Sequence, residues 1–263
     1  MDCNIIKKHD FLRSIARFAF LFILITLVFA CSKNKKDTSF FEPAEMLKEA
    51  DILISEEKYE EAREILEDIR VKDTTQKYAT IARLRIADTF FEDKSYEEAA
   101  VEYEAFLNVH TRHRHASYAQ FKLAMSYFNR IKAVDVSYSW ARRALDEFEK
   151  LQHNYPRNPY LDISEERIRV CKRVLAEFEL YVGRFYFKKG SFNAAILRFN
   201  NILKIYPGSA NEPDALYYIG LSYKKMGQKD KAEIALNSLI EKYPSIEITG
   251  KAKDLLASIL ENK

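Results

Sequence analysis

Three histidines within six residues could in principle bind a metal ion. They are His110, His113 and His115, and neutral imidazole is a common metal ligand. Arg112 and Arg114 stand between them, and their positive charges would repel a divalent cation. The pattern therefore favours a solvated basic loop over a metal site, and it assigns no role to the three histidines.

The rest of the chain has no spacing typical of a catalytic site. There is no Ser, His and Asp order of a hydrolase, no zinc-type spacing and no glycine-rich phosphate loop. The carboxylates of Glu60, Glu61, Glu97 and Glu98 are expected at helix starts, where negative charge interacts favourably with the helix dipole. Cys171 lies among apolar neighbours and is typical of a buried thiol that fills core space. We predict a protein that is not an enzyme and that holds no metal and no cofactor.

The composition indicates an all-α protein. The 263 residues include 48% hydrophobic and 31% charged residues, but only 6 Gly and 6 Pro. Average usage would give about 18 Gly and 13 Pro. So few turn residues argue against an all-β fold and against a nucleotide-binding fold with its glycine-rich loop. Lys plus Arg number 42 and Asp plus Glu 39, a balance that argues against a nucleic-acid-binding protein.

The first thirty residues are predicted to be a signal peptide that ends at a lipidation site. Four basic residues precede an uncharged run of 13 residues at 18–30, too short to span a bilayer core of about 30 Å. The run leads through Ala30 into Cys31, which resembles a bacterial lipobox, although Phe29 is bulkier than usual. We expect cleavage before Cys31 and a covalent lipid on its thiol, which would hold the protein at a membrane without a transmembrane helix.

Residues 31–42 are expected to be a polar tether between the lipid and the folded part. Removal of residues 1–30 leaves a formal net charge of +1. Ser32 stands where many Gram-negative lipoproteins carry the aspartate that retains them in the inner membrane. By that resemblance, the sequence favours the periplasmic face of the outer membrane.

A repeat of 37 residues organises the remaining chain. Residues of one segment recur, identical, 37 positions later. The matching residues are Tyr181, Gly183, Tyr186, Gly190, Ala195, Tyr206 and Pro207 with Tyr218, Gly220, Tyr223, Gly227, Ala232, Tyr243 and Pro244. Each unit has a small residue followed 12 positions later by an alanine, which lets two antiparallel helices approach closely.

The pattern resembles the tetratricopeptide repeat and predicts a right-handed solenoid of five such helix pairs. The expected units are 43–76, 80–113, 117–158, 176–210 and 213–247, followed by a capping helix near 248–262. Eight extra residues, Lys132 to Ser139, are expected to form a loop within unit three. Residues 161–174 are expected to extend the first helix of unit four, which divides the array into an N-terminal half at 43–160 and a C-terminal half at 161–263.

The concave face of such an array would bind other proteins. In units two and three it would carry mainly apolar and aromatic side chains suited to an extended peptide. The candidate groove residues are Leu84, Asp88, Phe91, Tyr118, Phe121, Met125, Phe128 and Asn129. In units four and five the corresponding face is more basic, with Arg184, Lys188, Lys224 and Lys225. An alternative is that several of these aromatic side chains pack between repeats.

Motifs in the second half resemble the BamD family, the tetratricopeptide-repeat lipoproteins of the β-barrel assembly machinery. They are DEF at 146–148, YPRNPY at 155–160, LAEFE at 175–179, VGRFY at 182–186 and KGSFNAAILRF at 189–199. The resemblance covers about residues 43–245, and Asn158 replaces a serine usual in the family.

The resemblance implies a scaffold in the periplasm with several partners. It would bind the barrel-forming assembly protein through its POTRA domains, the C-terminal segments of unfolded outer-membrane proteins, and other assembly lipoproteins. On the motif match, Arg198 would pair with an acidic POTRA residue. Three alternatives remain: a repeat lipoprotein that coordinates peptidoglycan synthesis or pilus assembly, a glycan hydrolase with a site made of loops, and a solute-binding lipoprotein.

Overall fold

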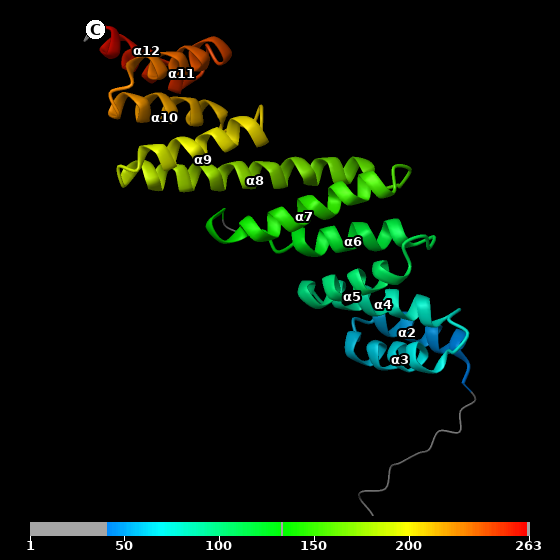
Figure 1. Cartoon of the computed structure of the whole chain (residues 1–263). Coiled ribbons are helices and arrows are strands. Elements are labelled where there is room, and N and C mark those ends of the chain that lie inside the picture. The colour runs from blue at the N-terminus through cyan, green and yellow to red at the C-terminus, as the bar shows by residue number, and fades with distance from the viewer. Residues whose placement is uncertain (1–40, 133, 262–263) are drawn as a thin grey trace, which may run out of the picture. The chain divides into compact units, whose positions relative to one another are not determined.

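The computed structural model describes residues 41–132 and 134–261, and these residues form eleven α-helices that follow one another in antiparallel order (Figure 1). The helices are α2 (Pro43–Ser55), α3 (Tyr59–Lys72), α4 (Ala79–Glu92), α5 (Tyr96–Val109), α6 (Ala116–Phe128), α7 (Val134–Asn154), α8 (Leu161–Lys188), α9 (Phe192–Ile205), α10 (Glu212–Lys225), α11 (Lys229–Lys242) and α12 (Glu247–Leu260). Each helix packs against the next, as the repeat pattern predicts. The predicted signal peptide, Cys31 and residues 32–40 of the tether lie outside the described residues.

Four of the five helix pairs are joined by the same three-residue turn. In each, the second residue after the first helix has a positive φ, between 60° and 76°. These residues are Glu57, Lys94, Gly190 and Gly227. A left-handed residue at this place is a common way to end a helix, and glycine adopts it without strain. Two of the repeated glycines therefore set the turn, while Glu57 and Lys94 adopt the same conformation without glycine.

Close contact between the paired helices depends on the small residues of the repeat. Ala62, Ala99 and Ala195 are fully buried on the second helices of their pairs. On the first helices, Gly183 lies against the ring of Phe199 and Gly220 against Leu236. The predicted core contacts are therefore confirmed.

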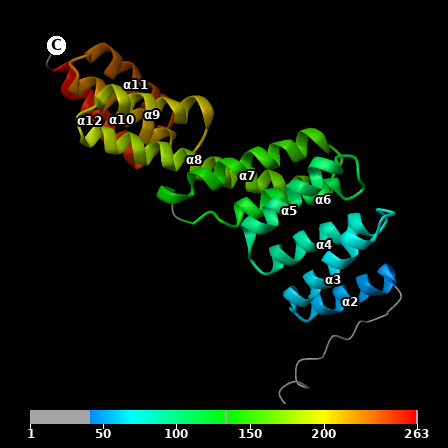
Figure 2. The same ribbon diagram turned by 60° about the horizontal axis from the view of Figure 1, so that its bottom comes forward.

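Helix α8 is 28 residues long and packs on α7 at one end and on α9 at the other (Figures 1 and 2). The predicted extension of the first helix of unit four is thus confirmed. The predicted capping helix is confirmed as α12. None of the helices among the described residues is long and apolar enough to cross a membrane.

The prediction of a loop at Lys132 to Ser139 was wrong, because α7 already begins at Val134. Six of the eight extra residues, 134–139, lie in this helix, which is 21 residues long. Its first turns are covered by aromatic contacts: Tyr138 lies 4.6 Å from Phe178 of α8, and Trp140 stacks on Tyr127 of α6 at 6.2 Å, both measured between ring centroids. Contacts of Tyr138 and Trp140 with helices on both sides support the helical state of this segment.

Candidate functional site

A pocket of about 420 Å³ lies between α4 and α6, on the predicted concave face. Its walls combine apolar and positively charged side chains. The lining residues are Ile81, Leu84, Arg85, Asp88, Arg114, His115 and Tyr118. We call it the groove pocket. It can accept an apolar side chain and an anionic group side by side.

Asp88 is buried in the wall of the groove pocket and holds two tyrosines. Its Oδ1 atom accepts hydrogen bonds from the hydroxyl of Tyr103, at 2.6 Å, and from that of Tyr118, at 2.8 Å. Its Oδ2 atom lies 3.5 Å from the Arg85 guanidinium. Burial raises the pKa of the Asp88 carboxyl and also the pKa of both tyrosine hydroxyls. The network fixes α4, α5 and α6 to one another, so the shape of the pocket depends on it.

Cations at the mouth of the groove pocket were missed by the sequence analysis. Arg85 is half exposed and also lies 3.2 Å from Asp51 of α2. Arg114 and His115 come from the turn before α6, and the Arg114 Nε donates a hydrogen bond to His115 Nε2 at 3.0 Å. Arg114 and His115 could have been predicted from the expected start of α6. Residues just before a helix of the concave face lie beside the first turn of that helix.

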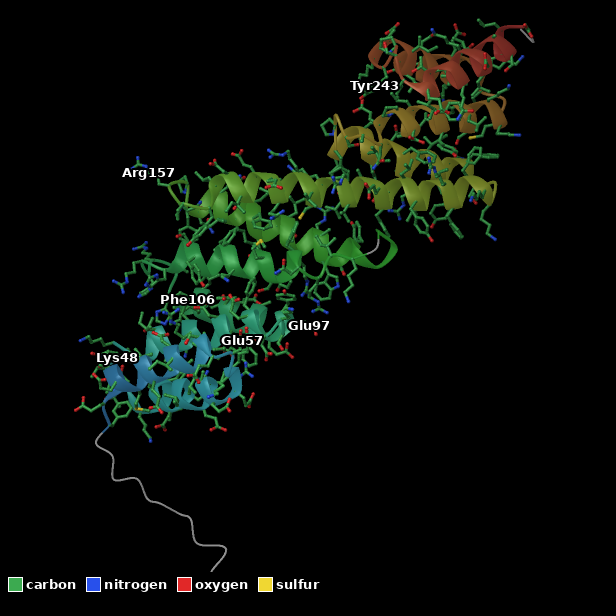
Figure 3. The ribbon with its side chains drawn as sticks, turned by 180° about the vertical axis from the view of Figure 1, so that it is seen from behind. Lys48, Glu57, Glu97, Phe106, Arg157 and Tyr243 are labelled. Atoms are coloured by element: carbon green, nitrogen blue, oxygen red, sulfur yellow. The ribbon has the colours of Figure 1, made fainter. Side chains whose placement is uncertain are left out.

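The three histidines lie in the turn between α5 and α6, where their rings pack against one another and against Phe106. His110 and His113 lie 5.0 Å and 5.6 Å from the buried ring of Phe106, measured between ring centroids. Phe106 itself belongs to α5 (Figure 3). Burial lowers the pKa of His110 and of His115, which favours their neutral forms. Within residues 41–132 and 134–261, no group of three or more potential metal ligands is present. The turn itself was predicted, but its packing against Phe106 was not.

Three of the predicted groove residues line the groove pocket, and the others do not. Leu84, Asp88 and Tyr118 meet in the groove pocket. Phe121 stacks on Tyr160 at 4.4 Å with its ring nearly parallel, and this places it between α6 and the start of α8. For Phe121, the structure therefore agrees with the alternative that aromatic side chains pack between repeats.

Three further members of the set have their own partners. Phe91 packs on Tyr96 at 5.4 Å and lies under the Lys122 ammonium at 3.8 Å. Phe128 lies 5.0 Å from the Arg167 guanidinium. Met125 packs half-buried against the central core cluster. These partly exposed side chains contact residues of neighbouring helices.

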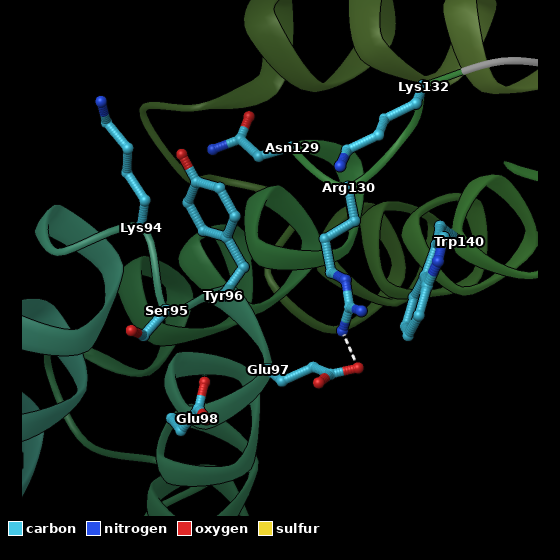
Figure 4. Close-up of a pocket in the computed structure, with 9 residues that line it drawn as sticks. All are labelled: Lys94, Ser95, Tyr96, Glu97, Glu98, Asn129, Arg130, Lys132 and Trp140. Carbon is cyan, nitrogen blue, oxygen red and sulfur yellow. Dashed lines mark ion pairs between the residues drawn. The ribbon is translucent and has the colours of Figure 1, made fainter.

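Asn129 belongs to a second pocket, of about 440 Å³, at the other end of the helices (Figure 4). This pocket lies between the α4–α5 turn and the start of α7 and is lined mostly by polar side chains. Arg130 forms an ion pair with Glu97 and lies 3.6 Å from the Trp140 ring. The indole ring of Trp140 in this pocket is therefore covered by Arg130.

The predicted basic residues of the C-terminal half have different contacts. Arg184 pairs with Asp214 of α10, and Lys224 donates a hydrogen bond to Ser258 of α12. Arg198 lies on α9, with its Nη1 atom 3.4 Å from Glu179 of α8. The buried Glu179 also accepts a hydrogen bond from Asn201. Lys188 and Lys225 are exposed. The part of Arg198 that stays exposed is available to a partner on the outer face of α9.

Cys171 is fully buried in the central core. Burial raises the pKa of its thiol to about 12, so the thiol is protonated at neutral pH. A protonated, enclosed thiol is a poor nucleophile, as expected of a side chain that fills space.

Paired antiparallel helices with alternating small and large contact residues define a tetratricopeptide-like repeat protein, a class that binds partners through its surfaces. Within this class the chain belongs to the YfiO family of outer membrane lipoproteins, whose profile matches residues 41–239. The predicted location at the outer membrane and the predicted family are thereby confirmed.

Curated relatives carry the name "Outer membrane protein assembly factor BamD". The one from Rickettsia prowazekii is 33% identical over 113 residues, which are 42% of this chain and 45% of the relative. The one from Vibrio cholerae is 30% identical over 92 residues, 35% of this chain and 38% of the relative. The chain thus matches less than half the length of either. Their naming as assembly factors agrees with the prediction that the chain is not an enzyme.

Among solved structures, the chain is similar to the TPR2AB domain of yeast Sti1 in complex with pHSP90. The identity is 14%, the coverage 82% of both chains and the TM-score 0.44. A tetratricopeptide repeat protein from Parabacteroides merdae is similar at 16% identity and a TM-score of 0.37, over 83% of this chain and 73% of the other.

Proposed function

We propose that the protein is a lipid-anchored periplasmic scaffold of the outer-membrane β-barrel assembly machinery. It binds the POTRA-containing barrel protein with its C-terminal repeats and the C-terminal segments of unfolded outer-membrane proteins with its N-terminal repeats. Family membership and the names of the curated relatives support this function. The lipid on Cys31 would keep both activities at the membrane.

The observation that carries the proposal is the groove pocket. A chain terminus that ends in an aromatic residue has an apolar side chain next to a free carboxylate. Leu84, Ile81 and Tyr118 supply apolar contact, and Arg85 and Arg114 supply positive charge. The negative charge of Asp88 is offset by the Arg85 guanidinium, which lies 3.5 Å from its Oδ2 atom, and this reduces its repulsion of a bound carboxylate.

A peptide experiment tests the groove pocket. A peptide with alternating apolar residues and a terminal phenylalanine should bind the full-length protein at least 10-fold more tightly with a free carboxylate than with a carboxamide. The reason is that a hydrogen bond to a charged group contributes about 1.5–3 kcal/mol. Fluorescence anisotropy measures both dissociation constants. Arg114→Ala should reduce the difference, while Lys94→Ala, an exposed lysine outside this pocket, should preserve it. Equal affinity of the two peptides would contradict carboxylate recognition.

The proposed binding of the POTRA region depends on Arg198. Arg198→Glu should weaken binding of the POTRA region at least 10-fold, because it places like charges together at the contact and also against Glu179. Lys204→Glu makes the same charge change on the same helix at an exposed position and controls for net charge. Surface plasmon resonance gives both affinities, and equal losses in the two variants would reject a specific role of Arg198.

A further inference from the structure

The imidazole of His115 lines the groove pocket, and its hydrogen bond to Arg114 requires the neutral form. The Nε2 atom of His115 accepts a hydrogen bond from the Arg114 Nε at 3.0 Å. An imidazole nitrogen that accepts a hydrogen bond carries no proton, so the single proton of the neutral ring is on Nδ1. Nε2 is therefore the atom that takes up a proton when His115 becomes charged.

The surroundings of His115 hold its imidazole neutral in the free protein. The titratable and charged groups that face it are Arg85 and Asp88 of α4, His113 and Arg114 of the α5–α6 turn, and Tyr118 of α6. Burial lowers the pKa of His115 most, the positive charge of Arg114 lowers it further, and the negative charge of Asp88 acts in the opposite direction. His115 is also the N-cap residue of α6, where the helix dipole disfavours a positive charge.

A carboxylate bound in the groove pocket would favour the charged form of His115. A negative charge within about 4–6 Å of an imidazole stabilises its protonated state. It also offsets the positive charges of Arg85 and Arg114, which disfavour protonation in the free protein. Protonation at Nε2 ends the hydrogen bond from Arg114, and the Nε–H of this exposed arginine can then be donated to the carboxylate. The charged imidazole and the released guanidinium both attract the anion.

We propose that His115 is a proton-linked binding residue of the groove pocket, which takes up a proton from solvent when the terminal carboxylate of an unfolded outer-membrane protein binds. This inference rests on the proposed function and adds a dependence on pH to it. Coupling between two ligands is reciprocal, so a proton that binds more tightly in the complex also tightens the binding of the peptide. A carboxamide carries no charge and does not favour the proton.

The affinity for a free carboxylate should therefore rise as the pH falls. The rise begins as the pH falls through the pKa of His115 in the complex, and it ends below the pKa of His115 in the free protein. The free-protein value lies below the ordinary histidine value of 6.5. The terminal carboxylate of the peptide stays charged over this range, because its ordinary pKa is about 3.3–3.7.

The test measures peptide binding to the full-length protein in detergent at pH 7.5 and at pH 5.5. The probe is a peptide with alternating apolar residues and a terminal phenylalanine, made with a free carboxylate or with a carboxamide. In fluorescence anisotropy, the carboxylate peptide should bind at least 3-fold more tightly at pH 5.5, and the carboxamide peptide should bind about equally at both pH values. Titration calorimetry at pH 6.5 in two buffers of different ionisation enthalpy should show proton uptake with the carboxylate peptide alone.

Two variants of His115 remove the titrating group. The side-chain carbonyl of His115→Gln can accept a hydrogen bond from Arg114 but does not titrate. His115→Asn is the second variant, since asparagine is a favoured N-cap residue and suits the start of α6. Both should lose the proton uptake and the change of affinity with pH. His153→Gln is the matched control, because His153 is exposed near the end of α7 and does not line the groove pocket. It should keep the wild-type ratio of affinities.

The outcomes separate the inference from the proposed function. If the wild-type protein prefers the carboxylate peptide equally at both pH values and takes up no proton, His115 is not proton-linked and the scaffold function stands. If the pH dependence persists in the His115 variants, another group binds the proton and the inference is overturned. If the wild-type protein binds both peptides equally at both pH values, carboxylate recognition by the groove pocket is overturned as well.

A further variant keeps the test decisive if neither His115 variant folds, which circular dichroism melts at both pH values would show. Asp88 is the other group of the pocket wall whose pKa is shifted toward this range, since burial raises it. Asp88→Asn removes that carboxyl. Proton uptake that persists in this variant supports His115, whereas its loss assigns the proton to Asp88 and overturns the inference.

Discussion

Replacement of Gly183 by alanine should lower the free energy of unfolding by about 2 kcal/mol. A Cβ atom at this position would lie 2.4 Å, 2.7 Å and 2.9 Å from three ring carbons of Phe199. Phe199 is fully buried and stacks on Tyr218 at 5.4 Å, so the ring cannot move aside without disturbing the core. Overpacking of this kind costs about 1–3 kcal/mol. Urea denaturation followed by circular dichroism measures the loss.

The same substitution at Gly250 is the control. Gly250 lies in α12, and no atom lies within 4 Å of a Cβ built on it. Since alanine is favoured over glycine inside a helix by about 0.5–1 kcal/mol, Gly250→Ala should stabilise the protein by that amount. The opposite signs of two identical substitutions would establish that helix crossing, and not helix propensity, requires Gly183. A stabilised Gly183→Ala protein would show that the two helices can separate at little cost.

This prediction uses the part of the fold that the sequence specifies most strongly. The 37-residue spacing of small residues and of the aromatic residues that pack against them is a local pattern, because both members of each contact lie within one helix pair. The extension of α8 was also visible, since Ile163, Ile168, Val170 and Val174 have a near-helical spacing. Contacts within a pair therefore need no knowledge of the rest of the molecule.

The start of α7 could not be predicted in this way. Residues 132–139 match no repeat position, and the start of α7 at Val134 is supported by Trp140 stacking with α6 and by Tyr138 contacting α8. These partners are supplied by neighbouring repeats. A segment that lacks a repeat pattern is predicted as a loop, because the neighbouring helices that contact it are not known from the sequence.

The groove residues could be predicted only in part, because some of their contacts also come from neighbouring repeats. Repeat register correctly placed Leu84, Asp88 and Tyr118 on one face. It could not show that Tyr160, which precedes α8, stacks on Phe121 and also lies 6.3 Å from the Tyr118 ring. The repeat register predicts which face of a helix a residue lies on. The exposure of its side chain also depends on the segments that connect the repeats.

Asp88→Ala should cost more than removal of any exposed groove residue, about 2–5 kcal/mol of unfolding free energy. The change leaves the hydroxyls of Tyr103 and Tyr118 without their common acceptor. Each buried, unsatisfied polar group costs about 1–3 kcal/mol. Tyr103→Phe removes one donor and leaves Asp88 its bond to Tyr118, so it should cost less. Denaturant unfolding of the three proteins at pH 7 tests this order, and a mild effect of Asp88→Ala would mean that water satisfies the tyrosines.

Asp88→Asn separates the hydrogen bonds from the charge. Both tyrosines donate to the same oxygen, Oδ1, which the asparagine carbonyl can replace. Burial raises the pKa of Asp88 in the folded protein above its ordinary value near 3.8, so the folded state binds this proton more tightly than the unfolded state. The stability contributed by protonated Asp88 is therefore present below about pH 4 and is lost as the pH rises through the raised pKa. Asparagine does not titrate, and the stability of Asp88→Asn relative to wild type should increase from pH 4 to pH 7. A relative stability that falls over this range would show that Arg85 outweighs burial and that the charged carboxylate is the favoured form.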